Sequence, residues 1–153
     1  GKDDDLAIAI ADKGGFFGVV IVPGFIQNNG SIATLDDFAD HVTHLVNIMG
    51  IDHVGIGTDI CGNGPETGLI YDDEFPDSMP GQIKYFQENP DEFNWGGFRP
   101  EHRLTPDYRI DGYSNFGDWP NITVKLAQRG FNENELQKLL GLNYLRYFQE
   151  VIG

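Results

Sequence analysis

Two short apolar segments, residues 16–22 and 53–59, constrain the fold of this chain more than any other feature. The first is continuously apolar and partly β-branched, and it ends at a Pro-Gly pair, while the second is punctuated by glycine and ends at Asp59. Continuous apolar runs of this length are typical of strands buried on both faces. Between them, residues 34–49 carry apolar side chains at helical spacing. This order predicts parallel βα units.

The ends of the helices can also be read from the sequence. Thr34 is a good N-cap for the helix between the two strands, and Gly50 follows its last apolar position. Near the carboxyl terminus, helical patterning restarts after Asn132, with Glu135 in a capping arrangement, and continues to residue 152. We therefore expect the chain to end in packed helices.

Length and charge limit the possible functions. The chain has 153 residues, whereas a complete (β/α)8 barrel typically needs about 250. Ten Lys and Arg residues against 24 Asp and Glu residues give a formal charge of -14, which argues against nucleic acid as a partner. Cys61 is the only cysteine, so no internal disulfide can form. We treat residues 1–153 as a single unit.

A long segment, residues 62–119, lacks any helical or strand periodicity. Loops longer than about 12–15 residues are uncommon in compact domains unless they are functional or disordered. This segment is rich in aromatic residues, including Trp95 and Phe98, which argues against disorder because these side chains offer much surface to bury. The pattern predicts an active-site loop insertion.

Asp59 is the strongest candidate for chemistry because it lies at the carboxyl end of a predicted strand, where active sites of parallel βα folds gather. A carboxylate there can orient an amino group, accept a proton or bind a metal. A buried Asp that only hydrogen-bonds a loop is the competing interpretation, and spacing alone slightly favours it.

Other titratable residues offer weaker candidates. His41 and His44 are three apart on the predicted helix, which permits shared metal coordination but places them on an outward face. Of the four histidines, only His102, in the long loop, is placed to reach a pocket. Cys61 has no His at a spacing that would support an activated thiolate.

Several segments together closely resemble the membrane dipeptidase (renal dipeptidase-like) family in order and spacing. The most specific are TLDDFADHVTHLV at residues 34–46 and GIDHVGIGTD at residues 50–59. The resemblance also extends backward and forward, through the segments 11–20, 119–122, 126–131 and 140–148. Only the middle loop is poorly covered.

The resemblance implies an α/β fold that is the carboxy-terminal portion of a (β/α)8 TIM-type barrel, with a long irregular loop after the last strand. It also implies hydrolysis of a dipeptide's amide bond with two zinc ions. In that family, the acid matching Asp59 contributes to catalysis, and an aromatic residue matching Phe25 lines the substrate pocket. Asn63 and His102 are further candidate substrate-binding residues.

The family's zinc ligands all precede the segment represented by these residues. The resemblance therefore predicts no metal ligand in this chain, a partner or longer chain that carries the amino-terminal half, and no activity for this piece alone. Cys61 stands where the family has a second acid, and Phe25 replaces a hydroxylated aromatic, so the substrate need not be an ordinary dipeptide. A non-catalytic module that binds a small molecule or peptide is the alternative, and a homo-oligomer is possible.

Overall fold

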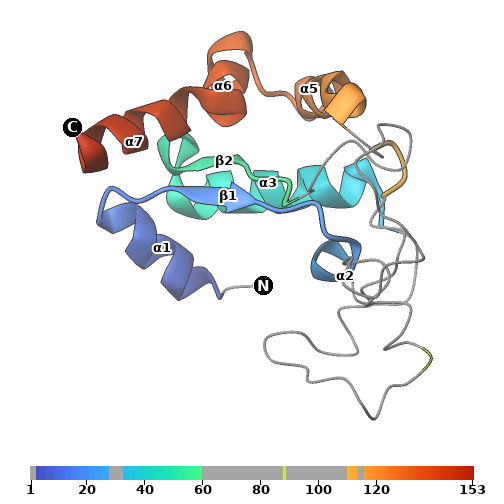
Figure 1. Ribbon diagram of the computed structural model, residues 1–153, viewed down its shortest axis with the longest axis horizontal. Coiled ribbons are helices and arrows are strands. Elements are labelled where there is room, and N and C mark those ends of the chain that lie inside the picture. The colour runs from blue at the N-terminus through green and yellow to red at the C-terminus, as the bar shows by residue number, and fades with distance from the viewer. Residues whose placement is uncertain (1–2, 28–32, 60–87, 89–109, 114–115) are drawn as a thin grey trace.

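Two parallel strands form the centre of the computed structural model, which describes residues 3–27, 33–59, 88, 110–113 and 116–153. Strand β1 (Phe17–Val19) pairs with β2 (Val54–Ile56), and Gly18 lies opposite Gly55. Figure 1 shows the two strands side by side in front of α3, with α1 on one side of the pair and α6 and α7 on the other. The parallel arrangement predicted from the order of the elements is confirmed.

Both strands are shorter than the apolar segments that predicted them. Single hydrogen bonds continue the pairing beyond the regular ladder: the Gly57 amide donates to the Val19 carbonyl at 3.0 Å, and the Ile21 amide donates to the Thr58 carbonyl at 3.1 Å. The two chains therefore stay adjacent as far as Ile21 and Thr58. His53, the first residue of the second segment, belongs to a 3-10 turn, η1 (Ile51–His53), instead of the strand.

Helix α3 (Leu35–Met49) connects the strands, and its predicted ends are confirmed. The Thr34 hydroxyl accepts from the Asp37 amide at 3.2 Å, while the Asp37 carboxylate accepts from the Thr34 amide at 2.9 Å. This reciprocal capping box satisfies two amides that the first helical turn leaves free. The helix ends at Gly50, whose φ of 85° is readily adopted only by glycine.

The remaining helices surround the strands. The capping box of Asn132 and Glu135 at the start of α6 confirms the predicted restart of the helix. A short helix, α2, directly after β1 was not predicted; its Pro23 occupies the first helical turn, where a missing amide costs nothing. In chain order these elements are α1 (Asp4–Asp12), α2 (Pro23–Ile26), η5 (Phe116–Asp118), α5 (Trp119–Gln128), α6 (Glu133–Gln137), the wider turn η6 (Lys138–Leu142) and α7 (Asn143–Ile152).

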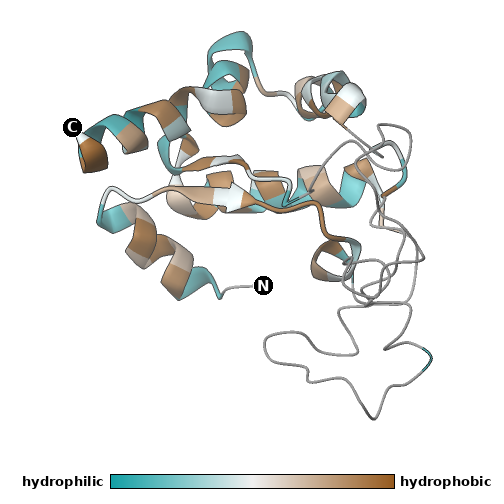
Figure 2. Cartoon of the chain, in the orientation of Figure 1, coloured by the Kyte–Doolittle hydropathy of each residue, from teal (hydrophilic) through white to brown (hydrophobic). Residues whose placement is uncertain are grey.

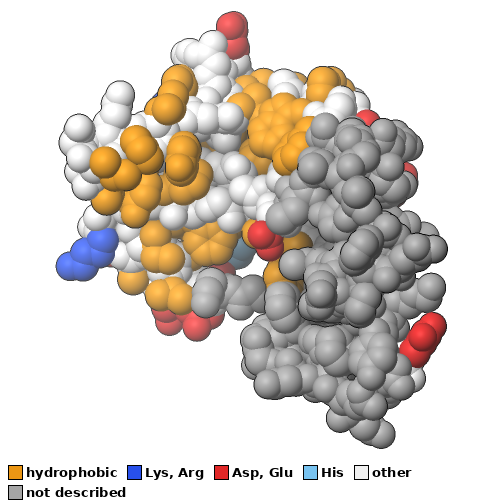
Figure 3. Space-filling view, in the orientation of Figure 1, with side chains coloured by type: hydrophobic (Ala, Val, Ile, Leu, Met, Phe, Trp, Pro, Cys, Tyr) orange, Lys and Arg blue, Asp and Glu red, His pale blue; other side chains and the backbone are white. Residues whose placement is uncertain are grey.

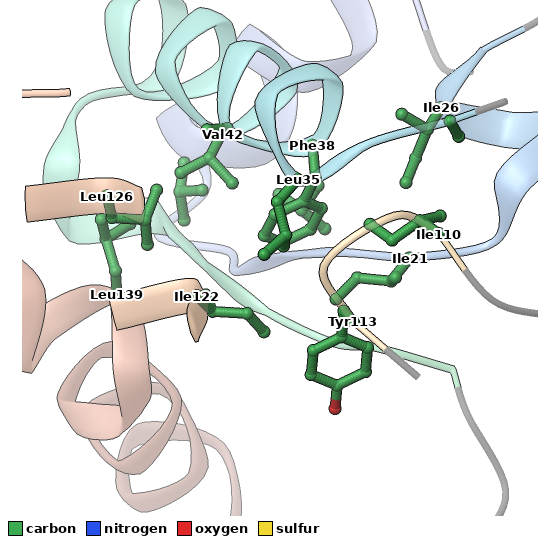
Figure 4. Close-up of a cluster of buried hydrophobic side chains, with 14 of the residues drawn as sticks. Ile21, Ile26, Leu35, Phe38, Val42, Ile110, Tyr113, Ile122, Leu126 and Leu139 are labelled. Atoms are coloured by element: carbon green, nitrogen blue, oxygen red, sulfur yellow. The ribbon is translucent and has the colours of Figure 1, made fainter. Parts of the chain in front are cut away.

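One hydrophobic core joins the strands to the helices. Phe38 and Val42 of α3 are fully buried, as are Ile122 and Leu126 of α5. Ile110, from a segment that bridges to the start of α3, completes the same cluster, as Figure 4 shows. In Figure 2 the strands and the faces that meet them are largely apolar. No helix within the described ranges is long and apolar enough to cross a membrane.

The amino end of β2 is fixed by Asn143, the first residue of α7. Its side-chain amide is almost fully buried and donates to the carbonyls of Ile51, at 2.6 Å, and Val54, at 2.8 Å. A side chain at Gly55 would lie 2.5 Å from the ring of Phe16 and 3.3 Å from the Leu139 carbonyl. Close packing at this point therefore depends on the glycine and on the buried amide.

Charged side chains hold α5 against the first turns of α3. Arg129 donates to the Asp36 carboxylate at 3.0 Å and pairs with Asp40, and Lys125 donates to Asp36 at 2.9 Å. Hydrogen bonds from Lys125 and then Arg129 lower the pKa of Asp36 below its ordinary value. The Asp36 and Asp40 side chains are largely exposed, so salt weakens their attraction to Lys125 and Arg129.

Replacing Asn143 with Ala is expected to lower the free energy of unfolding by about 2–3 kcal/mol, because two carbonyls lose their donor at a buried site. Asn121→Ala is the matched control, since this exposed amide makes one hydrogen bond, to the Gly112 carbonyl. The control is expected to lose less than about 1 kcal/mol. Urea unfolding of both variants measures the difference, and equal losses would contradict the role given to Asn143.

Acid is expected to weaken the contact between α3 and α5. Because the folded-state pKa of Asp36 is lowered, its contribution is fully present above the unfolded pKa of about 3.9 and is lost as the pH falls through the folded value. Between about pH 5 and pH 2, wild type should therefore lose more stability than Asp36→Asn. Thermal unfolding across this range measures the effect, which should shrink in about 0.5 M salt. Identical pH profiles would rule it out.

Candidate functional site

The carboxyl ends of β1 and β2 lie at one edge of the structure and carry the predicted site residues. β1 leads directly into α2, which holds Phe25, and β2 leads through Thr58 to Asp59. The Ile21 amide bonded to the Thr58 carbonyl keeps these two exits adjacent. Parallel strands place equivalent ends on the same side, so the sequence order brings Phe25 and Asp59 to one edge.

Asp59 is exposed and adopts an unusual backbone conformation. Its φ is 57°, the left-handed region that Asp and Asn enter more readily than most residues. The preceding Thr58 is 8% exposed and hydrogen-bonded through its backbone to β1. The Asp59 carboxylate thus projects from a firmly held strand end into solvent, where it can accept a proton or hold a cationic group. The competing interpretation, a buried Asp that only hydrogen-bonds a loop, required a buried side chain, whereas Asp59 is exposed.

Phe25 is half-buried on α2. Its amide donates to the Val22 carbonyl at 2.9 Å, and the neighbouring Ile26 is buried in the core. Because α2 is anchored in this way, the Phe25 ring is held at the same edge as Asp59. A partly exposed aromatic ring at this position is suited to contact an apolar part of a ligand.

Tyr113 lies near Thr58, at the carboxyl end of β2, and the sequence did not predict it as a site residue. It is fully buried, and Figure 4 shows its hydroxyl pointing away from the hydrophobic cluster. Within the described part of the chain, this hydroxyl has no well-formed hydrogen bond. Burial and the negative charge of Asp118 raise its pKa, and the nearby Thr58 side chain partly offsets that rise. Nothing in the sequence spacing connects Tyr113 with Thr58.

The helix histidines have different hydrogen-bond partners. His41 Nε2 lies 2.8 Å from the Ile26 carbonyl, and His44 Nε2 lies 2.9 Å from the Asp4 carboxylate. They line an open hollow of about 290 Å³ together with Ile26, Asp37 and Asp40. Asp37 caps α3 and Asp40 pairs with Arg129, so each carboxylate already has a structural role.

The described residues do not fit a zinc centre. Among them, no three His, Cys, Asp or Glu side chains gather closely enough to hold a metal ion. His53 is also occupied, since its Nδ1 lies 2.9 Å from the Gly15 carbonyl at the opposite end of β2. Two zinc ions require several His and carboxylate ligands at one point, and Asp59 alone does not supply them.

Known proteins match this chain over the segments that carried the resemblance. The family model described as membrane dipeptidase (Peptidase family M19) matches residues 2–76. An uncharacterized dipeptidase of Schizosaccharomyces pombe is 39% identical over 77 residues, which are 48% of this chain and 18% of that protein. Dipeptidase tcpJ of Claviceps purpurea is 22% identical over 137 residues, which are 90% of this chain and 22% of that protein.

This chain is similar to part of the membrane dipeptidase family, over about half of its own length in the family model. It spans about a fifth of the length of these curated relatives. The matched region contains both predicted strands, α3, Phe25 and Asp59. The family resemblance carried by residues 34–46 and 50–59 is thereby confirmed.

Solved structures agree with this similarity. An amidohydrolase from Pseudomonas aeruginosa has a TM-score of 0.69 and 29% identity, and the match covers 98% of this chain and 40% of that one. The probable dipeptidase PvdM from the same organism has a TM-score of 0.62 and 18% identity, over 97% and 40% of the two chains, which supports the fold alone. The mixed helix and strand arrangement of this chain is therefore similar to part of known amidohydrolase and dipeptidase structures.

Several predicted residues lie outside the part of the chain that the structure describes. These are Asn63, His102 and Cys61, together with most of the predicted loop insertion at 62–119. Their roles stay predictions. Of that insertion, residues 88, 110–113 and 116–119 are described, and the last of these form η5 and the start of α5 instead of loop. Residues 110–113 pair with the residues before α3 through the Asp111 amide, which donates to the Ala33 carbonyl at 2.8 Å.

Alkali is expected to destabilise the fold through Tyr113. A raised folded-state pKa means that its stabilising contribution is present below the unfolded pKa of about 10 and is lost as the pH rises through the folded value. Tyr113→Phe removes this ionisation and should flatten the decline in stability between about pH 9 and pH 11. Urea unfolding at several pH values tests this, and the exposed Tyr144→Phe serves as the control. An unchanged slope in Tyr113→Phe would contradict it.

Proposed function

We propose that this chain supplies the last strands and the substrate-pocket loop of a zinc-dependent dipeptidase that hydrolyses the amide bond of dipeptides or related small amides. The single observation that carries the proposal is the placement of Asp59. It stands exposed at the carboxyl end of β2, inside the segment that matches the membrane dipeptidase family. In parallel βα enzymes this end of the strands is where catalytic side chains gather.

The complete enzyme in this proposal is a (β/α)8 barrel, of which β1, α3 and β2 are the closing part. The match to two solved relatives over nearly all of this chain but only 40% of theirs supports that interpretation. The ligands for the two zinc ions come from the remaining part, on a longer chain or on a partner chain. When bound, the metal supplies the activated water that attacks the amide.

The residues of this chain have a narrower task. The Asp59 carboxylate accepts a proton or holds the substrate's ammonium group near the scissile bond. Phe25, anchored by α2, offers an apolar surface beside it. The Thr58 backbone bond to Ile21 holds the segments that follow β1 and β2 next to each other, which supports a shared role for Phe25 and Asp59 in orienting a small substrate.

Asp59→Asn is the sharpest test, because Asn also tolerates a φ of 57° and leaves the shape of the side chain unchanged. In the native, zinc-containing protein, this variant is expected to lose about 100-fold or more in kcat for dipeptide hydrolysis, since the carboxylate can no longer take a proton. Asp52→Asn is the matched control: this carboxylate pairs with Lys138 at the opposite end of β2 and should leave kcat unchanged.

The same assay distinguishes the dipeptidase from a non-catalytic binding module. Zinc-dependent turnover that disappears in Asp59→Asn and persists in Asp52→Asn supports the dipeptidase. Native protein that binds a dipeptide without hydrolysing it, with or without added zinc, would instead identify a non-catalytic binding module. Full activity in Asp59→Asn would show that Asp59 has no catalytic role.

A further inference from the structure

The Tyr113 hydroxyl is buried without a well-formed partner, although Figure 3 shows that much of the exterior is free to carry polar groups. Of the described residues, two have a buried side-chain atom that lacks a hydrogen bond, at the Tyr113 hydroxyl and at Arg146 Nε. Arg146 still donates through its other nitrogens to the Asp52 carbonyl and the Glu150 carboxylate. The Tyr113 side chain has no second polar atom, so burial of its hydroxyl costs folding free energy. Such a group calls for an explanation beyond packing.

The backbone around Tyr113 is firmly held, so the place from which its ring enters the core is well defined. The Asp111 amide donates to the Ala33 carbonyl at 2.8 Å, and the Asp111 carbonyl accepts from the Leu35 amide at 3.0 Å. Gly112 has a φ of 90°, and a side chain there would lie 2.8 Å from Leu35. The turn at residues 110–113 is thus joined to the start of α3, and the burial of Tyr113 follows from this attachment.

The hydroxyl lies near the strand end that carries Asp59. Figure 4 shows the Tyr113 ring beside the chain that continues from β2, and the Thr58 side chain there is close enough to offset part of the rise in the Tyr113 pKa. Thr58 is 8% exposed, and its carbonyl accepts from the Ile21 amide. Burial first, and then the charge of Asp118, raise the pKa of Tyr113. The phenol is therefore neutral near pH 7 and can donate a hydrogen bond to Thr58 Oγ1.

We propose that Tyr113 is a positioning residue for the proposed hydrolysis: its hydroxyl holds Thr58 and so fixes the direction in which the Asp59 carboxylate meets the substrate. This inference rests on the proposed function. Asp59 directly follows Thr58, and its φ of 57° lies in a narrow allowed region, so a shift of Thr58 turns the carboxylate. A misplacement of about 1 Å at a reacting group can cost as much as about 100-fold in rate.

The loose fit of the hydroxyl in the free protein agrees with this role. Hydrogen bonds that serve catalysis are often long or poorly aligned without substrate and tighten when it binds. A direct bond from Tyr113 to the substrate is a poorer alternative, because this side chain is fully buried whereas Asp59 is exposed. A purely structural role is also poorer, because a hydroxyl without a well-formed bond adds little to stability.

Tyr113→Phe in the native, zinc-containing protein removes the hydroxyl and keeps the ring. This variant is expected to lose about tenfold in kcat for dipeptide hydrolysis, with KM changed by less than about twofold, because orientation and not binding is impaired. Its urea midpoint at neutral pH should equal or exceed that of wild type, since an unpaired hydroxyl leaves the core. Tyr144→Phe, which removes an exposed hydroxyl, is the matched control and should change neither quantity. An unchanged kcat, or a lower urea midpoint, in Tyr113→Phe would overturn the proposal.

A double-mutant comparison tests whether the effect passes through Thr58. Thr58→Val removes the side-chain hydroxyl, and Thr58→Ser keeps it. Tyr113→Phe should lower kcat about tenfold in the Thr58→Ser protein but less than about twofold in the Thr58→Val protein, where the coupled hydroxyl is already gone. Equal losses in the two backgrounds would overturn the proposal. Native protein without dipeptide hydrolysis would refute the proposed function and this inference with it, whereas normal hydrolysis by Tyr113→Phe would refute the role of Tyr113 alone.

Discussion

The parallel pairing of β1 with β2 is the constraint on which the rest of the structure depends. Parallel neighbours need a crossover connection, and α3 supplies it while burying Phe38 and Val42 against the strands. Because the strands are parallel, both carboxyl ends lie at one end of the strand pair and both amino ends lie at the other. Phe25 and Asp59 therefore follow the carboxyl ends, while Asn143, at the start of α7, bonds near the amino end of β2.

Each end of the strand pair has a distinct physical character. At the amino end, buried hydrogen bonds from Asn143 and close packing at Gly55 leave little room for change. At the carboxyl end, an exposed carboxylate follows a buried threonine, and a tyrosine hydroxyl lies buried beside it. This division between a stabilising end and a reactive end is what parallel βα enzymes generally show.

In the proposed enzyme, the candidate site is one side of a larger centre. Asp59 is well placed for proton transfer or for holding an ammonium group, but activation of water by two metal ions requires ligands that the described residues do not bring together. The helix histidines illustrate the difference between spacing and assembly. His41 and His44 are close along the helix, yet one contacts a backbone carbonyl of α2 and the other an aspartate of α1.

Much of the local structure was predictable, because its causes lie within a few residues. The capping boxes at Thr34 and Asn132 each involve an acid three positions later, and the ends of α3 followed directly. The strands were predicted in the right places but came out shorter, because apolar character extends beyond the residues that form regular ladder bonds. Helix α2 was missed because Pro23-Gly24 is also the usual signal for a turn.

By itself, then, the sequence determined the order of the two strands and the helix between them, the capped ends of α3 and α6, the segment that resembles the dipeptidase family, and Asp59 at the end of a strand. Periodicity and capping are short-range properties, so they can be read along the chain. Only the tertiary structure decided that Tyr113 lies beside Thr58, that the two helix histidines bind different partners and that α7 leaves its large apolar side chains exposed. Burial and hydrogen bonding at those positions depend on residues distant in sequence, whose meeting no local pattern encodes.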